Sequence, residues 1–153
     1  MRRLGFSNTM NSVFHAGETT LQSAAGSRER LAEVGPRVIR EEMPEQHRAF
    51  FASLPFLVMA TTDPVGQPYV GMLTGSPGFV SAPDGRHLQI AGRPAPDDPL
   101  DALLLPGARF GLLGIEAHTR RRNRANGRVL ARSADGLSLG VVQSFGNCPK
   151  YIQ

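Results

Sequence analysis

The sequence predicts a mainly β domain, a small barrel of six or seven short strands with one inserted helix and further helices before the strands. From residue 54 onward, short apolar or β-branched runs alternate with turn sequences rich in proline, glycine and aspartate, a pattern typical of an all-β domain. Residues 98–105 interrupt this pattern with an expected helix, for which Asp97 or Asp98 is the cap. A chain of 153 residues with 41% hydrophobic content has the size of one domain with a continuous core.

The N-terminal segment differs in composition from the rest of the chain. Residues 1–26 are rich in serine, threonine, asparagine and glycine and show no sustained apolar period. They therefore predict an N-terminal arm or an extended lead-in. We expect a single folded domain over residues 27–153, with this arm preceding it.

Helical patterns begin at Ser27, which can cap a helix, and Gly35-Pro36 interrupts them. Because proline lacks the backbone donor that a helix interior needs, two short helices are favoured over one. A further helix is expected from Pro44 to about Ser53, with its two phenylalanines facing a core. His47 lies on this helix, and its isolated position indicates a structural or solvated side chain rather than a catalytic or metal-binding one.

Turn sequences divide the remaining chain into expected strands. These cover residues 56–62, 69–74, 79–81, 87–91, 108–116, 122–133 and 137–145, with turns at 83–85 and 134–136 among those between them. Asn126-Gly127 is a strong hairpin signal, but a turn there would make the preceding strand longer than usual. A turn near residues 117–121 is preferred, which leaves Gly127 inside a strand where it permits close backbone approach.

Arginine supplies nearly all the positive charge, since 16 of the 17 basic residues are arginines and four of them fall within five positions, 120–124. The planar guanidinium binds phosphate or carboxylate in a bidentate manner. On the expected strand, the period of two places Arg122, Arg124 and Asn126 on one face, which predicts a compact anion-binding face. The alternative interpretation of the run is a solvated surface.

Composition restricts the function classes. A net charge of +4 permits nucleic-acid, membrane-surface or phosphorylated small-molecule partners. The single cysteine, Cys148, excludes an internal disulfide framework and a thiolate-rich zinc site, and it fits a reducing cytoplasm. No apolar run approaches the roughly 20 residues that span a bilayer, and no signal-peptide core follows the N-terminus. We therefore expect a cytoplasmic protein.

Five separated segments carry a family resemblance. They are residues 14–18 with Gln22, Ile39-Arg40 before Met-Pro-Glu-Gln-His-Arg at 43–48, Gly-Ser-Pro-Gly-Phe at 75–79, the arginine run at 120–127, and Gln-Ser-Phe-Gly-Asn-Cys-Pro-Lys-Tyr-Ile-Gln at 143–153. With these segments in this order, the chain from about residue 14 onward resembles the flavin-nucleotide-binding, pyridoxamine 5'-phosphate oxidase-like family. The resemblance implies a split β-barrel of about six strands with N-terminal helices and one inserted helix, and a homodimer with two FMN sites at the subunit interface.

The resemblance also implies which residues hold the flavin phosphate. Arg122 and Arg124 are the expected phosphate ligands, with Asn126 as a directional hydrogen-bond partner, whereas Arg120 and Arg121 lie nearer the turn and are expected to be solvated. Arg93 is carried over because it follows the strand after which the family often places phosphate contacts.

Two further groups of residues complete the expected site. Thr74 and Gly75 offer a hydroxyl and a backbone donor, or serve only the turn that follows them. The terminal motif adds Gln143, Asn147, Cys148 and Lys150, among which the amides suit the mixed donor and acceptor edge of a flavin. Cys148 is either a nucleophile whose pKa is lowered by the nearby lysine or a small packed side chain.

The expected function is that of a cytoplasmic, dimeric FMN-binding oxidoreductase that passes electrons through its flavin to an unidentified acceptor, with the chemistry supplied by the cofactor. FAD or a deazaflavin are alternative cofactors. The chain has no tryptophan, whereas pyridoxamine phosphate oxidases proper usually carry one in their substrate-binding segments, so that activity is not expected. Members of the subgroup also occur joined to a ferredoxin-reductase-like domain, which implies a reductase partner. Alternatives are a flavin-binding module without turnover and an arginine-rich nucleic-acid binder, although aromatics that would stack on bases are not interleaved with the arginines.

Overall fold

The computed structural model describes residues 13–147. The chain divides into two compact units, Met1–Ile39 and Arg40–Gln153, and the division falls inside the segment expected to form one domain. No helix in the described residues is long and apolar enough to cross a membrane.

The first unit contains helix α1 (Ala16–Ala24), where the sequence predicted an arm or extended lead-in. Residues 16–24 are helical rather than extended because a capping box starts the helix. His15 Nδ1 accepts hydrogen bonds from the backbone of Gly17 and Glu18 at 3.1 and 3.3 Å. In return, the Glu18 carboxylate accepts from the His15 amide at 2.8 Å. Reciprocal capping satisfies the first-turn donors without any apolar stripe, and α1 buries no residue.

Helix α2 (Arg28–Val38) is continuous, which corrects the prediction of two short helices. Pro36 lies in its last turn, so it removes a single backbone bond near the end of the helix rather than breaking the interior. The Ile39 amide still donates to Gly35 O at 2.8 Å. Ser27 precedes the helix as expected but makes no side-chain cap, because its hydroxyl donates to Gln22 O at 3.3 Å.

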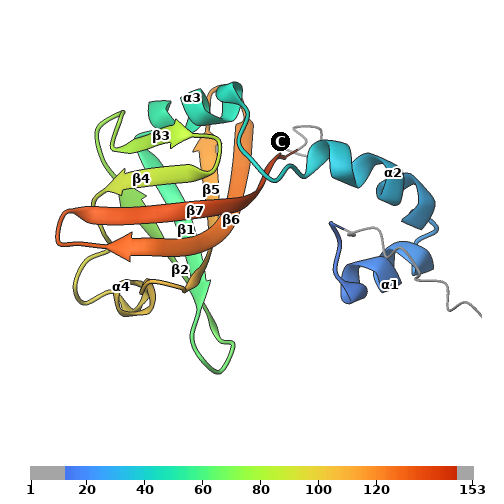
Figure 1. Cartoon of the computed structure of the whole chain (residues 1–153), viewed down its shortest axis with the longest axis horizontal. Helices are drawn as coiled ribbons and strands as arrows, with labels where there is room; N and C mark the ends of the chain where they lie inside the picture. The colour runs from blue at the N-terminus through green and yellow to red at the C-terminus, as the bar shows by residue number, and fades with distance from the viewer. Residues whose placement is uncertain (1–12, 148–153) are drawn as a thin grey trace, which may run out of the picture. The chain divides into compact units, whose positions relative to one another are not determined.

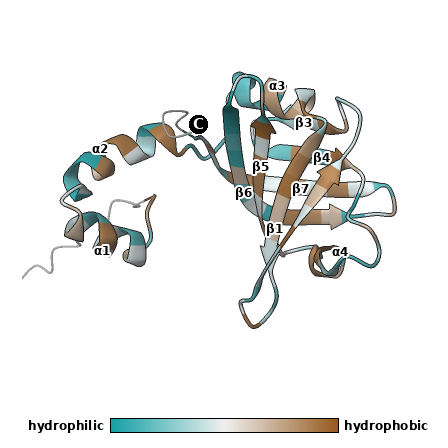
Figure 2. Cartoon of the chain, turned by 180° about the vertical axis from the view of Figure 1, so that it is seen from behind, coloured by the Kyte–Doolittle hydropathy of each residue, from teal (hydrophilic) through white to brown (hydrophobic). Residues whose placement is uncertain are grey.

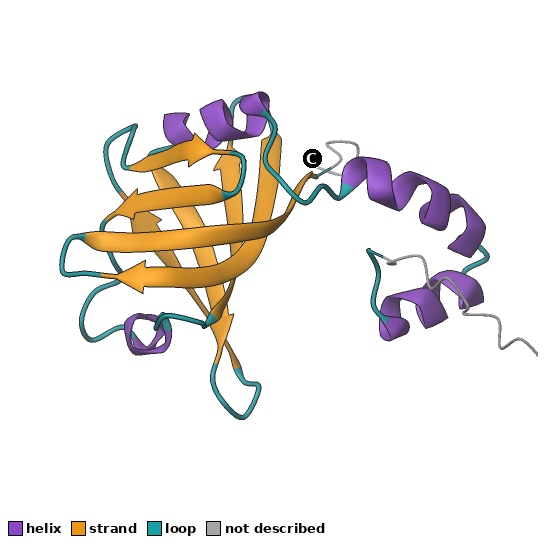
Figure 3. Ribbon diagram, in the orientation of Figure 1, coloured by secondary structure: helices purple, strands orange, loops and turns teal. Residues whose placement is uncertain are grey.

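The second unit is one seven-stranded antiparallel sheet with the strand order β2-β1-β5-β6-β7-β4-β3 (Figures 1 and 3). The strands are β1 (Phe56–Thr62), β2 (Pro68–Thr74), β3 (Val80–Asp84), β4 (His87–Ala91), β5 (Arg109–Glu116), β6 (Arg121–Arg132) and β7 (Gly136–Gly146). The sheet curls into a barrel but does not close, and β2 and β3 form its two edges. The mainly β prediction with one inserted helix is confirmed, and the described part of the chain contains seven strands.

Helix α3 (Glu45–Ser53) lies across one end of the barrel beside β3, as Figure 1 shows. Phe50 and Phe51 on this helix are buried in the core, as predicted. The contact requires a glycine on the sheet, because a Cβ on Gly114 would lie 2.6 Å from Leu54 Cδ1 and 2.7 Å from the Phe50 ring. Helix α3 therefore packs so closely on β5 that no side chain fits at Gly114.

Two turn predictions differ in outcome. The turn before β6 spans residues 117–120, so Asn126-Gly127 lies within a strand, and a Cβ on Gly127 would come within 1.8 Å of Gly140 O. The prediction of close backbone approach at Gly127 is thus confirmed. The turn predicted at 83–85 is displaced, since Pro83 and Asp84 belong to β3, an edge strand that tolerates proline.

Helix α4 (Pro99–Leu103) is shorter than predicted. The Asp98 carboxylate accepts a hydrogen bond from the Leu100 amide at 2.8 Å and caps it, which confirms one of the two expected caps. The helix ends at Leu103 because the following Leu104 has left helical geometry, with φ −81° and ψ 56°.

Candidate functional site

Strand β6 separates its residues onto two sides of the sheet. Asn123, Ala125 and Gly127 are buried on the core side, and Arg124 is exposed on the other side with Arg122 and Asn126 half-buried. The prediction that the period of two collects Arg122, Arg124 and Asn126 on one face is therefore confirmed. Figure 2 shows the strongly hydrophilic start of β6 beside the more apolar β5.

Strand register extends this face across five strands, because paired residues point to the same side of a sheet. Two neighbouring rows of directly paired residues make up the outer sheet face. One row is Met72, Val58, Leu113, Arg124 and Phe145, and the next is Val70, Ala60, Gly111, Asn126 and Gln143. Each row is apolar or small on β2, β1 and β5 and gains its polar or charged member on β6. An apolar surface therefore meets a basic and amide-rich border along β6.

A pocket of about 200 Å³ lies at this border. It is lined by Val58, Ala60, Gly111, Leu112, Leu113, Arg124 and Asn126. Two of its members, Ala60 and Gly111, carry almost no side chain, and a Cβ built on Gly111 meets no atom closer than Asn126 Oδ1 at 3.5 Å. The hollow thus exists because two small residues are paired across β1 and β5.

Four predicted site residues come together at the polar border. Arg124 Nε donates a hydrogen bond to Asn147 Oδ1 at 3.1 Å, and Asn126 Nδ2 donates to Gln143 Oε1 at 3.2 Å. The Asn147 amide also donates to Arg122 O at 2.9 Å, which extends the pairing of β6 and β7. The bond from Arg124 uses one of the five N–H donors of its guanidinium. The structure thus assembles a cationic fork and amides beside an apolar pocket.

The remaining arginines of the run have different positions. Arg120 lies in the turn with a φ of 59°, and Arg121 is exposed at the start of β6. Arg121 is not merely solvated, as the sequence suggested, because its Nη2 donates to Gln46 O at 2.8 Å and its Cζ lies 4.9 Å from the centre of the Phe50 ring. These two contacts of Arg121 hold α3 against the start of β6.

Arg93 does not lie with this group. Its guanidinium binds the buried Asp101 carboxylate at 2.9 and 3.1 Å and donates to Ser133 O at 3.0 Å. Arg132 binds the same carboxylate at 2.7 Å. Ser133 follows the end of β6 opposite to Arg124, so the Arg93 cluster joins α4 to the far end of that strand.

Thr74 and Gly75 end β2 at the rim of the sheet. Thr74 is exposed and paired with Phe56. The Gly75 amide already donates to Pro55 O at 3.0 Å, and a Cβ there would overlap the Phe79 ring. Gly75 thus serves the local fold, through a backbone bond to the residue before β1 and close packing against Phe79. Cys148 and Lys150 lie outside the described residues.

His47 has a role that sequence reasoning described only in general terms. Its side chain is 6% exposed, and its Nδ1 lies 2.8 Å from the hydroxyl of the fully buried Ser144. Burial, and then the charges of Arg40 and Arg121, lower the pKa of His47. The signal was present in the sequence, because residues 47, 50 and 51 share one helical face.

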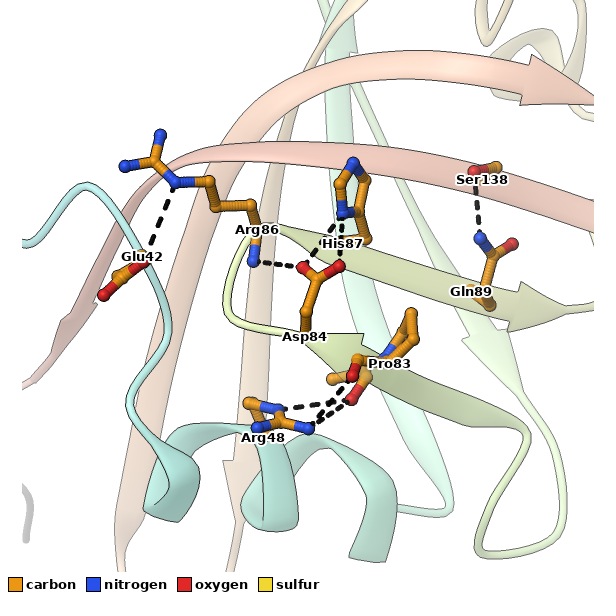
Figure 4. Close-up of polar contacts among 9 residues, drawn as sticks. Glu42, Arg48, Pro83, Asp84, Arg86, His87, Gln89 and Ser138 are labelled. Carbon is orange, nitrogen blue, oxygen red and sulfur yellow. Dashed lines mark hydrogen bonds and ion pairs between the residues drawn. The ribbon is translucent and has the colours of Figure 1, made fainter.

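A second polar region lies at the β3–β4 hairpin and along β4, where β4 pairs with the first half of β7 (Figure 4). The Asp84 carboxylate accepts from the Arg86 amide at 2.7 Å and contacts His87 Nδ1 at 2.8 Å, and these contacts lower the pKa of Asp84. Gln89 donates to the Ser138 hydroxyl at 3.0 Å beside an open groove of about 430 Å³. In the described residues, no group of three or more His, Cys, Asp or Glu side chains is placed to hold a metal.

No protein-family model matches the chain, and no curated protein matches it. Among solved structures, a point variant of HupZ from Group A Streptococcus superimposes with a TM-score of 0.51 at 10% identity, over 69% of this chain and 99% of that one. A pyridoxamine 5'-phosphate oxidase-like protein from Lactobacillus delbrueckii gives a TM-score of 0.50 at 15% identity, over 71% and 96% of the two chains. The fold is a split β-barrel.

A third split barrel matches more weakly. It is an FMN-binding protein from Syntrophomonas wolfei, with a TM-score of 0.47 at 11% identity over 82% and 97% of the two chains. Identities in this range establish a fold and not a ligand.

Proposed function

We propose that this split barrel is a cytoplasmic, homodimeric flavoprotein that binds FMN on the outer sheet face. The observation that carries the proposal is the pocket at Ala60 and Gly111, which is apolar on one side and bordered by Arg124, Asn126 and Gln143 on the other. The resemblance of the sequence to flavin-nucleotide-binding proteins points to the same ligand class.

The residues present fit a flavin. A planar ring needs a flat apolar surface, which the paired Ala60 and Gly111 provide because a Cβ on Gly111 would contact only Asn126 Oδ1, at 3.5 Å. Amide side chains offer both donors and acceptors without a charge, as Asn126 and Gln143 do here, and they suit the polar edge of such a ring. An arginine fork suits the phosphate, and Arg124 is the exposed guanidinium nearest the pocket.

Electron transfer is the chemistry that a flavin supplies when bound. The arginine and amides at the pocket suit binding and orientation, so we propose an oxidoreductase in which a reductase partner or domain delivers electrons and an unidentified acceptor receives them. FAD or a deazaflavin would use the same apolar surface with a different group at the basic border. The absence of tryptophan from the chain argues against pyridoxamine phosphate as the substrate.

We propose that a second copy of the chain buries the apolar part of the outer sheet face in a homodimer. Val70 and Met72 on the edge strand β2 are 69% and 62% exposed, and they continue the rows that contain the pocket. Contiguous apolar surface of this kind marks an interface. Burial under a second copy would also remove water from the pocket and strengthen the polar contacts at its border.

The first test is the absorbance spectrum of protein purified without added cofactor, with mass identification of what acid releases. Flavin bands near one per subunit and FMN in the extract are expected. A colourless protein that also fails to bind added FMN, FAD or a deazaflavin would overturn the proposal and favour the nucleic-acid alternative.

The second test locates the site with a matched pair of substitutions. Gly111→Leu fills the pocket from β5, and we expect it to abolish FMN binding in a fluorescence titration while the protein remains folded. Ala131→Leu adds the same side chain to an exposed position of β6 that lines the open groove instead. It should bind FMN as the wild type does. The reverse pattern would move the flavin to that groove.

A further inference from the structure

Ser144 is held from two directions by the segment that contains α3. His47 on α3 contacts its hydroxyl at 2.8 Å. Arg40, just before α3, exchanges two backbone hydrogen bonds with it, at 3.0 Å from the Arg40 amide and 2.7 Å from the Ser144 amide. Because Ser144 is fully buried and His47 nearly so, little water competes with the side-chain bond. Helix α3 thereby fixes one point of β7.

That point lies directly behind the outer sheet face. Ser144 pairs with Ala125, so its neighbours Gln143 and Phe145 stand opposite Asn126 and Arg124 on the other side of the sheet. A displacement of β7 at Ser144 would carry Gln143 and Phe145 with it. The polar border of the pocket therefore depends on this part of β7.

The β6–β7 ladder itself is interrupted just before this point. The register shifts between Asn126 and Gly127, which pair with Gln143 and Val141, so Val142 is an extra residue in β7. A bulge of this kind interrupts the ladder and bends the strand. Contacts outside the ladder, such as the bond from His47, are then needed to set where Gln143 lies.

The surroundings of His47 favour its neutral form. The charged groups that act on it from neighbouring elements are Arg40 and Arg121, both positive, and β7 contributes the neutral Ser144. Other charged groups near α3 pair with one another: Glu45 with Arg48 on the helix, Glu41 and Glu42 before the helix with Arg86, and Asp84 of β3 with His87. A proton on His47 would place a third positive charge beside two arginines at a buried position.

We propose that neutral His47 is a positioning residue for the outer sheet face, and that its protonation in mild acid releases β7 and weakens ligand binding there. The sign follows from the lowered pKa of His47. The unfolded chain binds this proton more readily than the folded one, so the stabilisation contributed by neutral His47 is complete above the ordinary pKa of about 6.5 and is lost progressively as pH falls from there through the lower pKa of the folded state. The part that concerns flavin rests on the proposed function.

Two variants and one control test the proposal. His47→Gln keeps an amide that can bond Ser144 but cannot titrate, Ser144→Ala removes the bond, and His87→Gln removes a half-exposed histidine on the other half of the sheet. FMN dissociation constants are measured at pH 7.5 and pH 5.5. We expect the wild type and His87→Gln to lose several-fold more affinity than His47→Gln on acidification, and Ser144→Ala to bind several-fold more weakly at pH 7.5. The FMN phosphate itself titrates near pH 6, but it does so equally for every variant.

A second measurement needs no flavin. Hydrogen exchange of peptides from β7, residues 141–146, should be faster in wild type than in His47→Gln at pH 5.5, while peptides from β1 exchange alike in both. Identical exchange and identical pH profiles in the two proteins would overturn the role of His47, as would tight FMN binding by Ser144→Ala. Failure of the wild type to bind flavin, with the difference in β7 exchange present, would instead overturn the proposed function and leave the positioning role standing.

Discussion

Arg124 and Arg121 provide the sharpest comparison, because they are three residues apart in the sequence and have different contacts. Arg124 faces the outer sheet face and bonds Asn147 through Nε. Arg121 bonds Gln46 O and lies over the Phe50 ring. Replacing each in turn with alanine removes the same charge from the same strand. Ligand binding should respond to the first change and stability to the second.

The structure sets the expected magnitudes. A charge-assisted hydrogen bond to a phosphate contributes about 1.5 to 3 kcal/mol where water is largely excluded. Arg124→Ala should therefore raise the FMN dissociation constant about 10- to 150-fold. Arg121→Ala removes an exposed cation–π contact and one hydrogen bond at the surface, together about 1 kcal/mol of unfolding free energy. It should lower Tm by about 3 to 5 °C.

The assay is a flavin titration at pH 7.5, paired with a thermal melt of each variant without ligand. Equal FMN affinities for the two variants would refute the assignment of Arg124 to the phosphate. A large loss of stability in Arg124→Ala would also refute it, because the weaker binding would then follow from a disturbed fold. Arg121→Ala additionally removes one of the charges that lower the pKa of His47, so in this variant the acid-induced loss of affinity should begin at higher pH.

Two further outcomes are expected. Val70→Lys should convert a dimer into a monomer in light scattering, while Val65→Lys, at an 89% exposed position outside the proposed interface, should not; a monomeric wild type would contradict the proposed homodimer. Asp101→Asn should lower the unfolding free energy in urea by about 2 to 3 kcal/mol, less than for a fully buried pair because Arg93 and Arg132 remain partly exposed. Asp84→Asn, which alters an exposed contact, should leave the unfolding free energy nearly unchanged. A loss of unfolding free energy in Asp101→Asn as small as that in Asp84→Asn would contradict a stabilising role of the Asp101 cluster.

The strands were predictable because local signals and tertiary packing agree for them. The boundaries of β1 and β4 match the predicted residues 56–62 and 87–91, since β-branched or alternating runs there end at strong turn sequences. The larger errors in secondary structure fall in the first unit. Helix α1 depends on reciprocal capping by His15, an unusual capping residue, and α2 tolerates Pro36 because of its position in the last turn. Neither fact is visible in apolar periodicity.

The site was predictable along one strand and less so across strands. Alternation alone placed Arg124 and Asn126 together, whereas their partners Asn147 and Gln143 were named only through the family resemblance. The apolar side of the pocket was missed. Ala60 and Gly111 carry no distinctive signal in the sequence and become a pocket only when the register of β1 and β5 pairs them. Arg93 was grouped with the phosphate ligands through the family resemblance, and its partner Asp101, eight residues further along the chain, is apparent only in the folded structure.

The arginine run does not act as one basic patch, because a β-strand divides it. Arg121 is on the same side of β6 as the buried Asn123, where α3 covers the end of the barrel, while Arg122 and Arg124 are on the outer side. A slip of the register by one residue would exchange these two sets. The same division holds on β7, where Ser144 contacts α3 and Gln143 faces the pocket. Contacts that stabilise the fold and groups proposed to bind flavin thus lie on opposite faces of the same two strands, β6 and β7. Substitutions in the core under α3 should therefore alter ligand binding at the outer sheet face.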